Sequence, residues 1–125
     1  MTRLLLDILW WLAGDERLST DAHEAIGEEL DPIFVSAASV WEIATKHRLG
    51  KLPAASAIVG DLAGVIESQG FVGLPITIRH GEGAGALPGP HRDPFNRMLI
   101  AQALLDDLVL VSNEQAFGAY GARLL

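Results

Sequence analysis

Residues 93–117, DPFNRMLIAQALLDDLVLVSNEQAF, constrain the fold more than any other stretch of this chain. The dipeptide Asp93-Pro94 indicates a turn, and the apolar-rich segment after it predicts a helix at about residues 96–106. The run 108–112 is short and apolar, which is typical of a buried strand. A helix that feeds a buried strand is a unit of α/β folds, so this stretch favours that class.

The rest of the chain alternates in the same way. The run 71–78 is predicted to be an edge or irregular strand because it contains Pro75. The glycine-rich segment 80–87 predicts a weak helix or a loop, since each glycine disfavours a helix. We therefore predict one domain with a mainly parallel sheet flanked by helices. Further strands are predicted at 3–6, 33–36 and 123–125, and further helices from residue 8, at 19–30, from a cap at Ser36 or Ser39, and at 53–67.

Composition bounds the class of protein. The 125 residues suffice for one domain with its own core. A hydrophobic fraction of 50% and a mean hydropathy of +0.29 are high for a soluble monomer, so we expect a buried subunit interface, as in a homodimer.

Cysteine is absent, which excludes a disulfide framework, a thiolate metal site and a thiol nucleophile, and fits a cytoplasmic location.

The start of the chain, MTRLLLDILWWL, is apolar but does not predict a membrane span. Asp7 interrupts a run that is already too short to cross a bilayer. A buried strand that enters a helix is the better interpretation.

The charge balance argues against a protein that coats DNA, and against no other class of nucleic-acid-binding protein. The formal net charge is -7 and the sequence pI is about 4.9, whereas proteins that coat nucleic acid are usually basic. A nuclease remains possible, because metal-binding carboxylates account for part of the acidity. Charge alone therefore decides neither for nor against a nuclease.

Polar residues gather at the ends of the predicted elements. Asp7 ends the first strand, Glu42 lies early in a helix, Asn96 begins another, and Ser112 and Glu114 follow the last core strand. Open α/β sheets build their sites at the carboxyl edge of the strands. The helix 96–106 reaches that edge only if it follows a strand there, for which residues 74–78 are the candidate. Oxygen ligands of this kind suit Mg²⁺ or Mn²⁺, although each residue taken singly has an equal claim to be a cap or a solvated loop residue.

Other polar and aromatic residues have simpler interpretations. Asp93 is interpreted as a turn or cap residue rather than a ligand. The tryptophans at positions 10, 11 and 41 are interpreted as core or interface residues rather than platforms for stacked bases. Three side chains are interpreted as surface charges, with contact to phosphate as the alternative: His91, Arg92 and Arg97.

Several segments together resemble a known family. In order along the chain they are LLLD, WWLAGDERLS, VSAASVWEIATKHRLGKL, GFVGLPIT, LPGPHRDPFNRMLIAQAL and LVLVSNEQAFGAYG. They are similar to the PIN-domain toxins of bacterial toxin–antitoxin pairs, the VapC type. The resemblance implies a PIN-like three-layer α/β/α sandwich, usually dimeric. It also implies a Mg²⁺- or Mn²⁺-dependent endoribonuclease that cuts RNA and is held inactive by a cognate, VapB-like antitoxin.

The resemblance carries over residue by residue. Asp7, Glu42 and Glu114 match acids of the family's catalytic and metal-binding set, and Ser112 stands where the family commonly has Thr. Asn96 falls on the third acid, which the family writes as Asp. Arg92 and Arg97, with Ser112, are the substrate-binding candidates that this interpretation implies.

Asn96 changes the expected activity. An amide oxygen is a neutral, weaker ligand and cannot act as a base, and cation affinity depends strongly on ligand charge. The segment after Asp7 is also about three residues shorter than is usual in the family. We therefore predict a weakened or inactive nuclease that still folds and binds its partner. The alternative is a catalytically silent, antitoxin-binding domain. A small-molecule α/β enzyme is disfavoured because no glycine-rich phosphate loop follows the first strand.

Overall fold

The computed structural model describes residues 3–8, 32–89 and 93–112 of the chain. In this part of the chain, four strands form one sheet in the order β3-β2-β1-β4, and every neighbouring pair is parallel. The predicted α/β class with a mainly parallel sheet is therefore confirmed. The strands are β1 (Leu4–Leu6), β2 (Ile33–Ser36), β3 (Val72–Leu74) and β4 (Val109–Val111).

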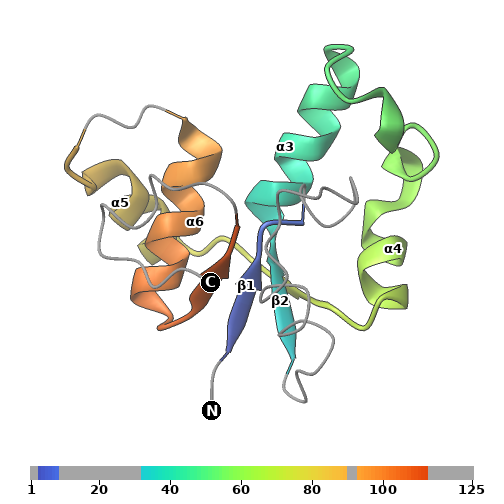
Figure 1. The fold of residues 1–125 in the computed structure, drawn as a ribbon. Coiled ribbons are helices and arrows are strands. Elements are labelled where there is room, and N and C mark those ends of the chain that lie inside the picture. Colours follow the sequence, from blue (N-terminus) through green and yellow to red (C-terminus); the bar gives the residue numbers. More distant parts are fainter. Residues whose placement is uncertain (1–2, 9–31, 90–92, 113–125) are drawn as a thin grey trace.

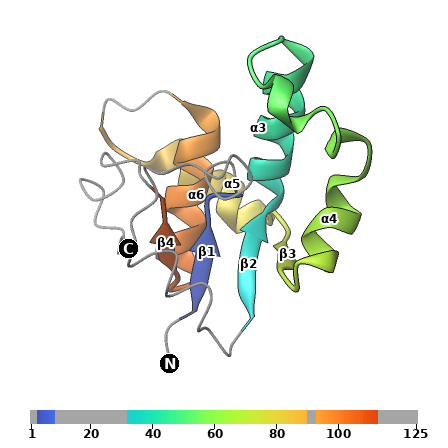
Figure 2. The same ribbon diagram turned by 45° about the vertical axis from the view of Figure 1, so that its right-hand side comes forward.

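Helices cover both faces of this sheet (Figures 1 and 2). Side chains of β1 alternate between two cores, because successive residues of a strand point to opposite faces. Leu4 and Leu6 belong to the core beneath α3 and α4, whereas Leu5 belongs to the core beneath α6. This gives three layers, and burial on both faces explains why β1 and β4 are continuously apolar. The helices are α3 (Ala37–Arg48), α4 (Leu62–Ser68), α5 (Ile78–Ala86) and α6 (Pro94–Leu105).

Local capping sets where two of the helices begin. The Ser36 hydroxyl accepts a hydrogen bond from the Ala38 backbone N–H at 3.0 Å, so Ser36, and not Ser39, is the cap of α3. The Asp93 carboxylate accepts from the backbone N–H groups of Phe95 and Asn96 at 2.9 and 3.2 Å. The interpretation of Asp93 as a cap residue is confirmed, and α6 begins at Pro94, slightly earlier than predicted.

The predicted single helix at 53–67 is wrong. The chain instead forms two 3₁₀ turns, η1 (Pro53–Ala55) and η2 (Val59–Asp61), before α4. The Asp61 carboxylate accepts from the Gly64 backbone N–H at 3.1 Å and so starts a new helix inside the predicted one. Gly70 follows the end of α4 with a φ of +79°, as expected for a glycine that stops a helix.

The predicted strand at 71–78 is shorter than expected, and the weak helix after it is a regular one. β3 ends before Pro75, because proline cannot donate to a sheet ladder. Thr77 then caps α5, whose bounds include all three glycines of the segment 80–87. β3 lies at one edge of the described sheet, as the proline predicted. None of the described helices is long and apolar enough to span a bilayer.

Candidate active site

Asp7 and Ser112 lie together where β1 and β4 end. The Asp7 backbone N–H donates to the Val111 carbonyl at 3.0 Å, which extends the pairing of the two strands by one residue. The Ser112 hydroxyl donates to Asp7 Oδ2 at 3.0 Å. Both side chains are buried, with only 3% and 4% of their surface exposed. A carboxylate therefore sits at the carboxyl edge of the sheet with its orientation set by a neighbouring hydroxyl.

Glu42 approaches the same edge from α3, which starts directly at the end of β2. Its side chain is buried, at 4% exposure, although it lies on the second turn of the helix. Glu42 Oε2 lies 3.0 Å from Lys46 Nζ, one turn further along. The ammonium group of Lys46 therefore lies against the Glu42 carboxylate. A buried carboxylate needs such compensation.

Asn96 lies on the first turn of α6, which also begins at this edge. The helix leads directly into β4, so it runs opposite to the strands and must start beyond their carboxyl ends. The Trp41 ring on α3 and the Phe95 ring on α6 meet edge to face, with 4.8 Å between centroids, which joins the beginnings of the two helices. The expected placement after a strand at 74–78 is wrong, because α5 lies between β3 and α6.

Three of the expected site residues fall within the described part of the chain. Asp7 directly follows β1, Glu42 lies on α3 and Asn96 lies on the first turn of α6. That they form one site stays a prediction. Glu114 and Arg92 lie outside the described residues. Within residues 3–8, 32–89 and 93–112, no three His, Cys, Asp or Glu side chains are grouped as a metal site would require. Two carboxylates and one amide are nevertheless oxygen donors of the kind that Mg²⁺ and Mn²⁺ accept.

Arg97 makes contacts that the sequence did not indicate. Its Nε donates to the Ala84 carbonyl at 3.0 Å, and its Nη2 lies within bonding distance of the carbonyls of Gly85 and Leu87. These carbonyls lie at the end of α5, where the last residues of a helix lack partners within it. Its guanidinium group therefore caps the end of α5, and its expected role in substrate binding stays a prediction.

Two further residues of α3 are informative. Trp41 was expected in the core or an interface; 60% of its surface is exposed, so it is not a core residue, and its place in an interface stays a prediction. Ser39, named only as an alternative cap, is 1% exposed, and its hydroxyl has no hydrogen-bond partner within the described part of the chain. Its spacing of three residues from Glu42, which puts both on one side of a helix, is the sequence signal that would have drawn attention to it.

A second polar cluster joins α5 to the far end of α6, and we call it the α5–α6 brace: Thr77, His80, Gln102 and Asp106. His80 Nδ1 accepts from the Thr77 backbone N–H at 3.0 Å and lies 3.4 Å from Gln102 Nε2. Because that backbone group can only donate, the ring hydrogen is on Nε2, which donates to Asp106 Oδ2 at 2.9 Å. His80 is 3% exposed. Sequence reasoning did not identify this cluster, whose members are far apart along the chain.

Comparison with known protein families matches residues 7–122 to the PIN domain, which is nearly the whole chain. The match begins at Asp7, the first of the site residues, and it agrees with a parallel sheet between two layers of helices. No curated protein matches the chain. On the extent of the family match, the chain belongs to the PIN-domain family.

Proposed function

We propose that this chain is a metal-dependent endoribonuclease of the toxin type, whose cleavage of RNA is weakened or lost because of Asn96. PIN domains are generally metal-dependent nucleases, which sets the class of chemistry. The observation that carries the proposal is the buried pair of Asp7 and Ser112 at the carboxyl edge of the sheet, where the Ser112 hydroxyl orients the carboxylate. The buried Glu42 approaches the same edge from α3.

Each residue has a defined task in this proposal. Asp7, Glu42, Asn96 and Glu114 would hold a Mg²⁺ or Mn²⁺ ion, and Ser112 keeps Asp7 in place. When bound, such an ion polarises a phosphate and makes a water molecule more acidic. Lys46 balances the charge of Glu42 and holds its carboxylate on one side of α3. Asn96 contributes an oxygen but neither a negative charge nor a base, so it limits both ion affinity and proton removal.

The test is to restore the missing acid. Asn96→Asp should increase Mn²⁺-dependent RNA cleavage by about tenfold or more, because ion affinity changes by orders of magnitude with ligand charge. The matched controls are Asn96→Ser, which adds no charge, and Asp7→Asn in the Asn96→Asp background, which removes one again. Neither should show the gain. If Asn96→Asp cleaves RNA no faster than the unaltered chain, the nuclease proposal is wrong.

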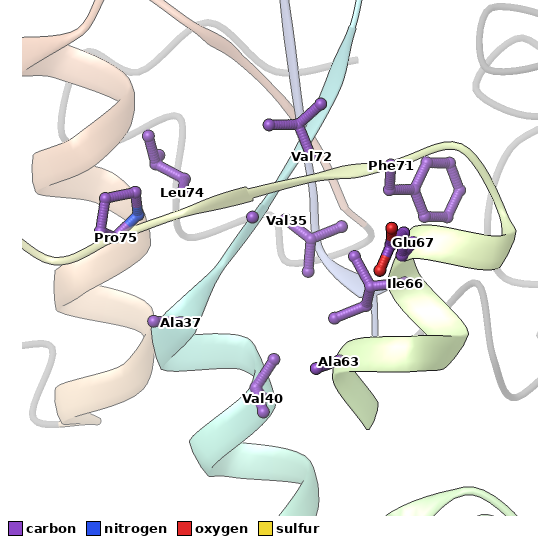
Figure 3. Close-up of a pocket in the computed structure, with 11 residues that line it drawn as sticks. Val35, Ala37, Val40, Ala63, Ile66, Glu67, Phe71, Val72, Leu74 and Pro75 are labelled. Atoms are coloured by element: carbon purple, nitrogen blue, oxygen red, sulfur yellow. The ribbon is translucent and has the colours of Figure 1, made fainter. Parts of the chain in front are cut away.

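A second candidate is a catalytically silent domain whose role is to bind an antitoxin, and one feature favours it. An apolar groove of about 650 Å³ runs between α3, α4 and β3 (Figure 3). Val40 and Ala63 line it from the two helices, and Val72 of the edge strand is 41% exposed beside it. Such a groove is suited to an apolar helix or strand of a VapB-like antitoxin.

One assay separates the two candidates. Mn²⁺ is titrated into the unaltered chain and into Asn96→Asp while RNA cleavage is followed. A nuclease responds to the ion in at least the Asn96→Asp variant, whereas a silent binding domain responds in neither. In both cases a homodimer is expected, because the chain is unusually apolar for its size.

A further inference from the structure

We propose that Ser39 is a positioning residue of the same site, whose hydroxyl binds a water molecule carried by the divalent ion. This inference rests on the proposed function and assigns a residue that the family's acidic set does not contain. Its support comes from the burial of Ser39, its unsatisfied hydroxyl and its position on α3.

The hydroxyl of Ser39 is buried without a partner in the described part of the chain. The side chain is 1% exposed, and its Oγ has no hydrogen-bond partner there. Ser39 lies on the first turn of α3, where the residue four positions earlier belongs to β2, so the helix itself offers its hydroxyl no carbonyl at that spacing. Leaving a buried hydroxyl unsatisfied destabilises a fold, so such groups are rare and require an explanation. A ligand that the hydroxyl binds would provide one.

The position of Ser39 on α3 places it beside the proposed ion. Successive helix residues are about 100° apart, so Ser39 lies between the directions of Ala38 and Ile43. Ala38 faces the beginning of α6, with which it lines a small cavity, and Ile43 packs in the core formed by β1. Ser39 therefore faces the space between the end of β1 and the beginning of α6, where Asp7 and Asn96 lie. Glu42 follows it by one turn on the same side.

A contact through water fits the chemistry better than direct coordination. Mg²⁺ gives up its water molecules reluctantly and usually keeps several when it is held by carboxylates. A serine hydroxyl both donates and accepts, so it can bind such a water in either direction. Groups that orient ligands in this way typically change metal affinity by about 10- to 100-fold when they are removed.

Ser36 provides a matched control on the same helix. It lies three residues before Ser39 and is also buried, at 0% exposure. Its hydroxyl is used by the fold, because it accepts from the Ala38 backbone N–H at 3.0 Å. Replacing each serine by alanine removes the same atom from nearly the same place. Only the loss at Ser36 should weaken the fold.

The experiment measures ion binding and stability separately. Mn²⁺ alone is titrated into the unaltered chain, Ser39→Ala and Ser36→Ala, each with and without Asn96→Asp, and free Mn²⁺ is followed by electron paramagnetic resonance. Thermal unfolding is measured in EDTA. Ser39→Ala should raise the Kd for Mn²⁺ by about 10- to 100-fold and leave the unfolding midpoint in EDTA unchanged or higher. Ser36→Ala should lower that midpoint, because it removes a helix cap.

Two results would overturn the inference while leaving the proposed function intact. In the first, Ser39→Ala binds Mn²⁺ as tightly as its parent. In the second, it lowers the midpoint in EDTA as much as Ser36→Ala does, which would make the hydroxyl part of the fold. If neither the unaltered chain nor Asn96→Asp binds Mn²⁺, the metal site itself is rejected, and the role of Ser39 is rejected with it.

Discussion

The two ends of α6 carry two polar clusters that differ in how their hydrogen bonds are used. At its far end, the α5–α6 brace forms a chain of hydrogen bonds from Thr77 through the buried His80 to Asp106. The Gln102 amide nitrogen lies 3.4 Å from His80, whereas Gln102 Oε1 has no partner within the described part of the chain. At its beginning, the site contains the bond between Ser112 and Asp7, but the Ser39 hydroxyl has no partner within the described part of the chain. Each cluster contains buried polar side chains, and both join elements far apart in the sequence.

This difference in hydrogen bonding indicates that the brace stabilises the fold and that the site binds a ligand. Polar groups that satisfy one another in the interior make a fold more rigid and specify it. Gln102 still bonds through its amide nitrogen, whereas the buried Ser39 side chain has no hydrogen-bond partner at all within the described part of the chain, so Ser39 points instead to something outside the chain. We therefore expect substitutions in the brace to act on the free energy of unfolding and substitutions in the site to act on ion binding.

The largest effect is expected at the centre of the brace. His80→Ala should lower the free energy of unfolding by about 2–4 kcal/mol, because it leaves buried donors and acceptors without partners. Urea unfolding in EDTA measures this change. His47→Ala is the matched control, since the ring of His47 is partly exposed. Its hydrogen bond to the Ser56 hydroxyl, at 3.1 Å, is exposed to solvent. That variant should lie within about 0.5 kcal/mol of the parent. Equal effects at the two histidines would contradict the structural role of the brace.

A smaller loss of stability is expected when Arg97 is replaced. Its size separates the role of Arg97 as a cap of α5 from a role in binding substrate. Arg97→Ala should lower the free energy of unfolding by about 1.5–3 kcal/mol, because charged hydrogen bonds to the end of α5 are lost. Arg97→Lys should recover only part of this, since a lysine cannot contact several carbonyls with one planar group. Urea unfolding and RNA binding are measured in parallel. Weaker RNA binding with unchanged stability would show that Arg97 serves the substrate instead.

The smallest effect on stability is expected when Asp7 is replaced. The stabilisation of the fold by added Mn²⁺ should be lost completely in the same variant. Asp7→Asn should change the free energy of unfolding in EDTA by less than about 1 kcal/mol, because an amide oxygen can still accept from the Ser112 hydroxyl. Added Mn²⁺ should then no longer raise the unfolding temperature, since a ligand stabilises only a state that it binds. Unfolding scans with and without Mn²⁺ measure both. A persistent rise in Asp7→Asn would remove Asp7 from the proposed site.

Much of the fold was predictable because its signals are local. The strand at Ile33–Ser36 and the cap at Asp93 follow from neighbouring residues alone. The errors arose from local caps that were not recognised, as at Asp61, and from packing between distant residues. The glycines of α5 disfavour a helix, yet the helix is regular, because Thr77 and His80 cap it reciprocally and α6 packs against it. At Gly83 a side chain would meet Leu105 at only 3.0 Å, so the glycine allows the two helices to approach closely.

The proposed membership of the candidate site rests on resemblance to a family, whereas the arrangement of its residues needed the folded chain. The amino-acid sequence alone determines that β1 and β4 are apolar and that each is followed by a polar residue. It does not determine that Asp7 and Ser112, 105 positions apart, share a hydrogen bond. That follows from the parallel pairing of Leu6 with Val111, which places the residues after both strands side by side. It is decided by the packing of the whole sheet, because hydrophobic burial specifies which strands pair, whereas the polar residues at their ends contribute little to that choice.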